Sequence, residues 1–173
     1  MMFVAGDIRL RALEPEDLEW LYRIENDEHV WKWGNANVPY SRYALKKYIA
    51  ESCHDIYADG QMRLAVVSRD EGTVVGCVDL MNFSPRHLRA EVGILIFPDY
   101  QGRGYGVEVL RMLMAYAREH LCLHLLYAVV SERNARARRA FEKAGFVLSG
   151  ILADWLREGK DKYVSACLYC CRW

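Results

Sequence analysis

The chain has 173 residues and a mass of 20.1 kDa, with 53% hydrophobic and 27% charged residues. These values fit a single soluble domain over residues 1–173 and exclude a disordered, fibrous or low-complexity chain. The 23 basic and 23 acidic residues cancel, so no net charge directs the protein to nucleic acid or to a membrane. Residues 1–60 nevertheless hold 7 Lys or Arg against 11 Asp or Glu, and residues 101–140 hold 7 Arg against 3 Glu. We expect a cationic ligand near the first region, unless it is only solvated surface, and an anionic ligand near the second.

The sequence gives no sign of a membrane or a secretory route. No apolar run approaches the roughly 18 residues that a membrane-spanning helix needs. Residues 1–7 lack the basic segment that opens a signal peptide. We therefore expect a cytoplasmic protein in which the six cysteines stay reduced. No metal is expected, because the Cys and His residues do not form a set of about four convergent ligands.

The N-terminal third predicts one strand and two helices. Residues 8–12 alternate apolar and basic side chains, as a half-buried strand does. Pro15 suits the first turn of a helix, and Ser41 suits the N-cap of a second one. Between these helices, residues 26–40 are rich in Asn, Gly and Pro and predict a loop.

From Gln61 onward the hydrophobic period changes to two, and strands dominate. A hairpin is predicted around a turn at 70–72. Residues 104–121 predict the longest amphipathic helix, and residues 134–144 a shorter one that Gly145 ends. Further strands are expected at 62–66, 73–83, 89–97, 123–130, 147–155 and 162–171. Together these elements predict an α/β (α+β) fold with about seven strands and four helices.

The most informative segment links an apolar strand to the longest helix and reads Phe97-Pro98-Asp99-Tyr100-Gln101-Gly102-Arg103-Gly104-Tyr105-Gly106. Its three alternate glycines allow a tight turn that a ligand can approach closely. The helix N-terminus that follows favours an anion, and Arg103 adds a positive charge. We interpret the segment as a pyrophosphate cradle. It lacks the Gly-Lys-Ser/Thr ending of a Walker A loop and the G-x-G-x-x-G spacing of a dinucleotide fold.

The same segment resembles the Q/R-x-x-G-x-G/A motif of the GNAT N-acetyltransferase superfamily, with Gln101, Gly104 and Gly106 at the defining positions. The second conserved block of that superfamily is similar to Asn134-Ala135-Arg136-Ala137 and Lys143-Ala144-Gly145-Phe146. Within the superfamily, the chain most resembles the branch of spermidine and ribosomal-protein alanine N-acetyltransferases, on the evidence of two segments: Arg89-Ala90-Glu91 and Pro98-Asp99-Tyr100-Gln101-Gly102. This resemblance covers essentially the whole chain. It implies an acetyl-CoA-dependent enzyme with a GNAT-like mixed, mostly antiparallel sheet and a cofactor cleft between the central strands.

The resemblance also implies where acetyl-CoA binds. An unpaired strand edge would pair with the pantetheine arm through the main-chain groups of Ile94, Leu95 and Ile96. The pyrophosphate would be held by the amides of Gln101, Gly102, Arg103, Gly104, Tyr105 and Gly106. Asn134 would reach the pantetheine arm through its side-chain amide. The same asparagine would also cap the last helix without any cofactor.

Acetyl transfer needs a base for the amine and a tolerable thiolate leaving group. Glu91 is the candidate base, directly or through water, because it lies on the strand that would bind the thioester. A paired or surface carboxylate is the alternative for this residue. Many relatives carry a tyrosine as general acid seven residues after the motif asparagine, where this chain has Phe141. Phe141 could pack on the cofactor but has no proton to donate, and Tyr163 is a candidate substitute that no spacing supports.

The amine acceptor is expected between the acidic N-terminal third and the strand that contains Asp79 and Asn82. Trp31 and Trp33 lie in the predicted loop, where they could cover an aliphatic amine or a peptide N-terminus, or anchor the loop to the core. Spermidine enzymes of the resembled branch have an acidic pair in this loop. Residues 33–37 read Trp-Gly-Asn-Ala-Asn instead, which argues against polyamine specificity.

Two other functions are weighed against this one. A non-catalytic CoA-binding regulatory module would explain Phe141. A nucleic-acid binder is disfavoured, because its arginines would spread around a helix without an aromatic platform: Arg133, Arg136, Arg138 and Arg139. We therefore expect an N-acetyltransferase that moves the acetyl group directly, in a ternary complex, to a small amine, a polyamine or a protein N-terminus. The sequence leaves homo-oligomerisation open.

Overall fold

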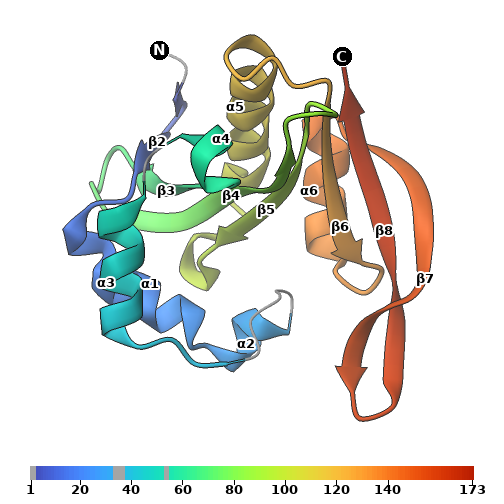
Figure 1. Ribbon diagram of the computed structural model, residues 1–173, viewed down its shortest axis with the longest axis horizontal. Coiled ribbons are helices and arrows are strands. Elements are labelled where there is room, and N and C mark those ends of the chain that lie inside the picture. Colours follow the sequence, from blue (N-terminus) through green and yellow to red (C-terminus); the bar gives the residue numbers. More distant parts are fainter. Residues whose placement is uncertain (1–2, 33–37, 53–54) are drawn as a thin grey trace.

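The computed structural model describes residues 3–32, 38–52 and 55–173. These residues form one sheet of eight strands in the order β1-β2-β3-β4-β5-β6-β8-β7 (Figure 1). Every neighbouring pair is antiparallel except β5 and β6, which run parallel. The predicted mixed, mostly antiparallel sheet is therefore confirmed. The strands are β1 (Val4–Ala5), β2 (Ile8–Ala12), β3 (Met62–Ser68), β4 (Val74–Ser84), β5 (Arg89–Ile96), β6 (Leu125–Ser131), β7 (Val147–Gly159) and β8 (Lys162–Arg172).

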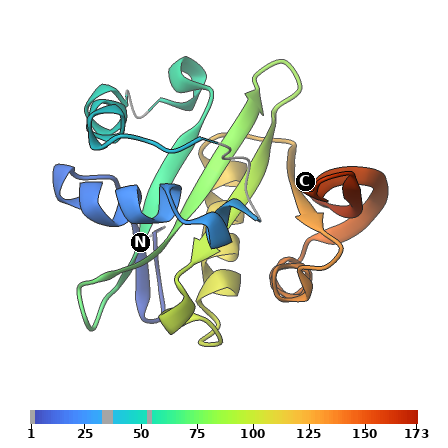
Figure 2. The same ribbon diagram turned by 90° about the horizontal axis from the view of Figure 1, so that it is seen from below.

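Helices cover both faces of the sheet, as Figure 2 shows from below. The α-helices are α1 (Leu18–Glu25), α2 (Glu28–Trp31), α3 (Arg42–Glu51), α4 (Ile56–Asp59), α5 (Tyr105–Glu119) and α6 (Ala135–Ala144). The larger core lies under α5 and α6, where Val109, Leu113 and Ala144 pack against the sheet. A smaller core lies under α1 and α3 on the opposite face. Among the described residues, no helix is long and apolar enough to cross a membrane.

The structure has one strand and two helices more than the sequence predicted. Strand β1 has two residues, too few to show alternation, and folds back on β2. Helices α2 and α4 are single turns, each begun by an aspartate whose side chain accepts a backbone N–H. The prediction of an unbroken loop over residues 26–40 was wrong at α2, because four residues cannot display a helical hydrophobic period. The predicted caps are confirmed, since Ser41 accepts from the Ala44 amide and Gly145 ends α6 at φ 114°.

The last two strands form a hairpin that extends past the rest of the sheet (Figure 1). Strand β6 ends where Ser131 pairs with Ala166, whereas β7 and β8 continue to the pair Gly159 and Lys162. Strand β7 is also the edge of the sheet, and it runs four residues beyond the predicted end at Trp155. Large apolar side chains of this edge face solvent, with Val147, Ile151 and Trp155 63%, 58% and 60% exposed.

Candidate active site

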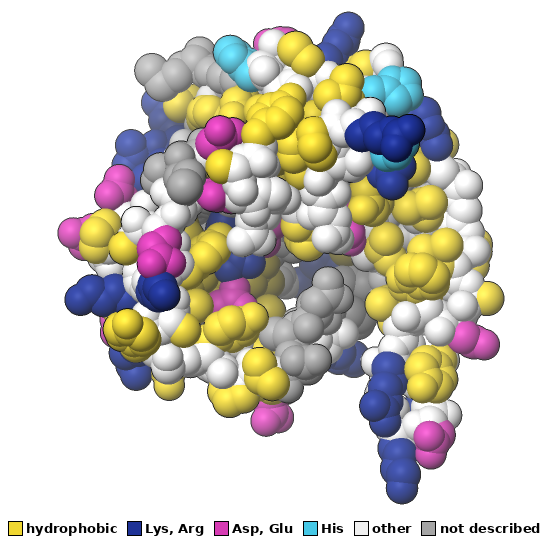
Figure 3. Space-filling view, in the orientation of Figure 1, with side chains coloured by type: hydrophobic (Ala, Val, Ile, Leu, Met, Phe, Trp, Pro, Cys, Tyr) yellow, Lys and Arg dark blue, Asp and Glu magenta, His cyan; other side chains and the backbone are white. Residues whose placement is uncertain are grey.

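The two parallel strands separate after only three residue pairs. Strand β5 pairs with β6 at Arg89, Ala90 and Glu91, and the last of these lies opposite Tyr127. Beyond that pair, β5 stays bonded to β4 as far as Ile96, and β6 stays bonded to β8 as far as Ser131. We call the space between residues 92–96 and 128–131 the cleft, and the Glu91–Tyr127 pair its closed end. Figure 3 shows the surface hollowed between the part of the molecule that contains β5 and the part that contains β6.

The glycine-rich turn lies at the open end of the cleft, directly after β5. Gly102 and Gly104 have φ of 81° and 85°, conformations that strain any other residue. A Cβ built on either glycine would meet nothing within 4 Å, so both face open space. Gly104 is the N-cap of α5, and no side chain caps this helix. The first amides of α5 therefore point out of the helix without an intrahelical acceptor, as a pyrophosphate requires.

The side chains of Gln101 and Arg103 bond to backbone carbonyls in and beside the turn, and so stabilise its conformation. The Gln101 side chain donates to the Ile96 carbonyl at 2.8 Å, and the Gln101 amide donates to the Pro98 carbonyl at 3.2 Å. The Gln101 amide is thus engaged within the turn, and the amides of residues 102–106 are the ones placed to receive an anion. Arg103 donates to the Asp99 carbonyl and lies within 4.0 Å of Glu71. Tyr105 is buried in the core, so only its backbone can face a ligand.

Both walls of the cleft offer polar groups to an extended ligand. Residues 92–96, which include Ile94, Leu95 and Ile96, pair with β4 and leave their second backbone edge turned to the cleft. Across the cleft, Asn134 is the N-cap of α6, and its Oδ1 accepts from the Ala137 amide at 3.1 Å. The capping role foreseen for Asn134 is thus present, and its Nδ2 group is the donor that a ligand can use. The edge of β5, the turn and Asn134 fit one elongated molecule with an anionic end.

Polar side chains gather at the closed end. The Asn82 side chain donates to Glu91 Oε2 at 2.8 Å. Asn82 has φ 50° and lies in an irregularity of the β4–β5 ladder, which turns its side chain toward the neighbouring strand. Burial first, and then the negative charge of Glu91, raise the pKa of Tyr127 above its ordinary value, while Arg89 opposes this. The structure therefore brings together the expected base, one expected acceptor residue and a tyrosine.

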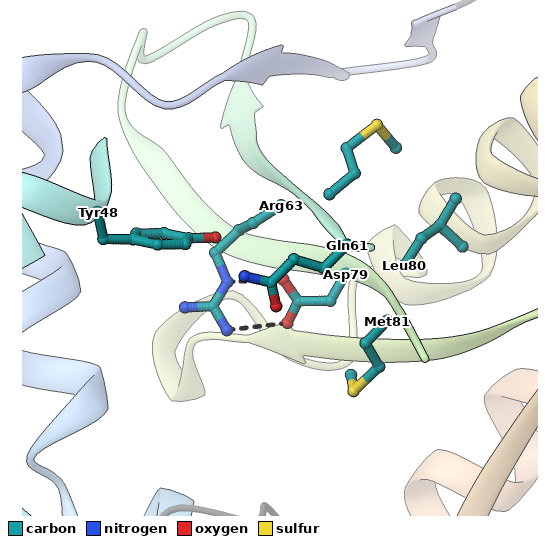
Figure 4. A pocket seen from close by; sticks show the side chains of 7 residues that line it. Tyr48, Gln61, Arg63, Asp79, Leu80 and Met81 are labelled. Atoms are coloured by element: carbon teal, nitrogen blue, oxygen red, sulfur yellow. Dashed lines mark hydrogen bonds and ion pairs between the residues drawn. The ribbon is translucent and has the colours of Figure 1, made fainter. Parts of the chain in front are cut away.

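Asp79 is bound to an arginine. Arg63 on β3 donates to both Asp79 oxygens, at 2.6 and 3.0 Å (Figure 4). It also donates to Glu25 of α1. Burial alone would lower the pKa of Arg63, but the charges of Asp79 and Glu25 raise it well above its ordinary value. The cavity beside this cluster has only about 70 Å³ and is lined in part by Tyr48 and Gln61. Asp79 is thus part of an ion-pair cluster and is not available as a lone carboxylate for an amine.

Comparison with known proteins identifies the chain. Residues 7–147 match the acetyltransferase (GNAT) domain. The spermidine N(1)-acetyltransferase of Escherichia coli K12 is 31% identical over 149 residues, which cover 86% of this chain and 77% of that protein. The chain belongs to the GNAT acetyltransferase family.

Solved structures of the family agree with the fold. The spermidine N-acetyltransferase of Vibrio cholerae in complex with CoA and spermine is 25% identical, with a TM-score of 0.84, and 97% of this chain matches 96% of that one. A dodecameric structure of the same enzyme is 25% identical, with a TM-score of 0.79, over 97% of this chain and 95% of that chain. This GNAT protein is accordingly an N-acetyltransferase that takes acetyl-CoA as co-substrate.

The remaining expected residues lie apart from the closed end or outside the described residues. Trp31 anchors α2, since its Nε1 donates to the Glu25 carbonyl at 2.6 Å. Trp33 lies outside the described residues. Phe141 is 3% exposed and packs on Phe146, so little of its ring can touch a cofactor.

Sequence reasoning missed Arg63 and Tyr127. Arg63 could have been found, because a hairpin that turns at 70–72 places it opposite Asp79, and the two side chains are opposite charges in otherwise apolar strands. Tyr127 gave no such signal. It stands in the nearly unbroken apolar run of β6, where a tyrosine is expected to be part of the core.

Proposed function

We propose that this GNAT enzyme acetylates a primary amine of a small aliphatic polycation such as spermidine or spermine. Its relatives from Escherichia coli and Vibrio cholerae are spermidine acetyltransferases. The net charge near the closed end supports a cationic acceptor. The cluster of Glu25, Asp79 and Arg63 has two carboxylates and one guanidinium and so carries a net negative charge, and the Glu91 carboxylate adds to it. The sequence of residues 33–37 argues against polyamine specificity, but these residues lie outside the described ones, so the proposal rests on the relatives and on the carboxylates near the closed end.

One observation carries the proposal: the β5–β6 ladder stops at Glu91, so a carboxylate stands where the cleft closes. A thioester laid along β5 with its phosphates at the turn would bring its acetyl group toward this end. Glu91 would then remove a proton from the attacking amine, directly or through water, while Asn82 holds the carboxylate in place. Both substrates would be bound together, and the acetyl group would pass directly from sulfur to nitrogen.

We also propose that residues 1–173 act as one catalytic domain that assembles with copies of itself. A continuous eight-stranded sheet within the described residues supports the first part. The apolar edge of β7 supports the second, since exposed Val147, Ile151 and Trp155 would be covered by another subunit. The Vibrio cholerae enzyme of the same fold has a dodecameric structure. Sedimentation of the purified chain tests this part of the proposal, and a monomer at all concentrations would contradict it.

An amine panel tests the main proposal. Release of free thiol from acetyl-CoA is followed with spermidine, spermine, a simple alkyl monoamine and a peptide with an N-terminal alanine. We expect kcat/KM for a polyamine to exceed that for the monoamine by about tenfold or more, because each additional desolvated charge contact contributes about 1.4 kcal/mol or more. A higher value for the peptide would move the function to protein N-termini. CoA binding without thiol release from any amine would indicate the regulatory module instead.

A further inference from the structure

The proposed reaction lacks an obvious proton donor for the departing sulfur. Phe141 stands where relatives carry the acid, and its buried ring has no acidic proton. Tyr163 is too far away. It lies seven residues along β8 from Cys170, which pairs with Tyr127 at the closed end. At about 3.3 Å per residue, this places Tyr163 roughly 23 Å from the Glu91–Tyr127 pair.

Tyr127 projects from the same face of the sheet as the candidate base Glu91, the face opposite α5 and α6. Its neighbours Leu126 and Ala128 are buried in the core under α5 and α6. Because side chains alternate along a strand, Tyr127 projects from the opposite face, and so does its partner Glu91. Tyr127 is only half-buried, so a ligand in the cleft can reach its side chain.

The surroundings of Tyr127 keep its hydroxyl protonated. The groups that face it are Glu91 and Arg89 from β5 and the buried Cys170 thiol from β8. Burial and the Glu91 carboxylate raise its pKa, and Arg89 lowers it by less. A tyrosine with a raised pKa stays protonated throughout the neutral range, so its proton is present when the sulfur departs. Protonation of Glu91 would remove the charge that raises this pKa, so Tyr127 becomes a stronger acid once Glu91 has taken a proton.

We propose that Tyr127 donates the proton to the departing sulfur of CoA, in exchange with Glu91. This inference rests on the proposed function. The nitrogen lone pair forms the new bond to the acetyl carbon, the carbon–sulfur bond breaks, and its electron pair stays on sulfur. The amine proton passes to Glu91, the Tyr127 hydroxyl proton passes to sulfur, and the proton on Glu91 returns to Tyr127. An amine and acetyl-CoA thus give an amide and free CoA, with both side chains restored.

The test begins with Tyr127→Phe, which keeps the ring and removes only the hydroxyl. We expect kcat to fall about tenfold or more, with CoA affinity and the thermal midpoint unchanged, because only a transition-state interaction is lost. Tyr163→Phe is the matched control and should keep the wild-type kcat. Wild-type kcat and pH profile in Tyr127→Phe would overturn the inference while leaving the acetyltransferase itself intact. A wild-type chain that binds CoA and acetylates no amine would instead overturn both proposals.

A second variant separates proton donation from packing. Incorporation of 3-fluorotyrosine at position 127 leaves the shape nearly unchanged and makes the phenol more acidic. If Tyr127 donates the proton, the alkaline limb of the kcat profile moves to lower pH. The same amino acid at position 163 should not move it. An unchanged alkaline limb at both positions would show that the Tyr127 ring only packs.

Discussion

The half of the molecule around the turn after β5 and the half around Arg63 are built by different means. The first uses main-chain groups: two glycines at positive φ, the free edge of β5 and the uncapped N-terminus of α5. The second uses side chains that meet from distant elements, as Glu25 of α1, Arg63 of β3 and Asp79 of β4 do. In the proposed function the first half would bind the cofactor and the second the acceptor, and we refer to them as the cofactor half and the acceptor half. The cofactor half should then keep its function under many side-chain changes, whereas the acceptor half should depend on a few ions.

The two halves meet at Glu91, and its substitution should have the largest effect. Glu91→Gln keeps the shape, and the Asn82 contact can be retained through the amide oxygen. Loss of the base should lower kcat by about 10²–10⁴ with CoA affinity unchanged. Steady-state kinetics and a calorimetric CoA titration measure the two quantities. A wild-type kcat would show that Glu91 is a structural carboxylate and that the two halves do not share a catalytic centre.

The acceptor half should be the more sensitive to loss of a charge. Arg63→Met leaves Glu25 and Asp79 partly buried without their cation, which should cost about 3 kcal/mol of unfolding free energy. Arg42→Met is the control, because its partner Glu19 is 69% exposed, and it should change stability little. Urea denaturation of both variants makes the comparison. Equal stability of the two variants would show that the Arg63 cluster does not hold the acceptor half together.

The cofactor half should be sensitive to backbone conformation instead. Gly104→Val places a β-branched side chain at φ 85°, in the space where an anion would lie. We expect CoA affinity to fall about a hundredfold, or ~2.7 kcal/mol. Gly60→Val is matched, since Gly60 has φ 68° and an equally open Cβ position but lies at the end of α4. Similar CoA affinity in the two variants would remove the turn from the binding site.

Acid should destabilise the chain in part through Asp17, which precedes α1, although by less than the preceding changes. Burial raises the pKa of Asp17, but hydrogen bonds from Arg11, Trp20 and the Glu14 amide outweigh it and leave the pKa lowered. A lowered folded pKa means stability that is present above the unfolded value of about 3.9 and is lost as pH falls through the folded value. Asp17→Asn should flatten this dependence between about pH 5 and pH 2. Thermal melts across that range measure it, and parallel curves for both proteins would exclude Asp17 as the cause.

The same division explains how far the sequence could be read. The turn belongs to one continuous segment, so its glycine spacing and the helix that follows were enough to predict an anion site there. The roles of Asn134 and of the strand edge came from the family resemblance, whose motifs are also continuous segments. The Arg63 cluster joins residues as far apart as Glu25 and Arg63, and no local period reports such a meeting. Helices α2 and α4 were missed because a single turn has no period. Phe141 was foreseen as a cofactor contact, yet its ring packs mainly on Phe146 and Tyr169, a consequence of how α6 lies on the sheet.

Hydrogen exchange with and without CoA tests most directly the claim that the cofactor is held by main-chain groups. The amides of residues 102–106 have no backbone acceptor among the described residues, and the alternate amides of residues 92–96 that do not bond to β4 face the cleft. Both sets should become protected when CoA binds. The peptides that contain Glu25, Arg63 and Asp79 should exchange at the same rate in both samples. Protection confined to those three peptides, with residues 102–106 unchanged, would contradict the account.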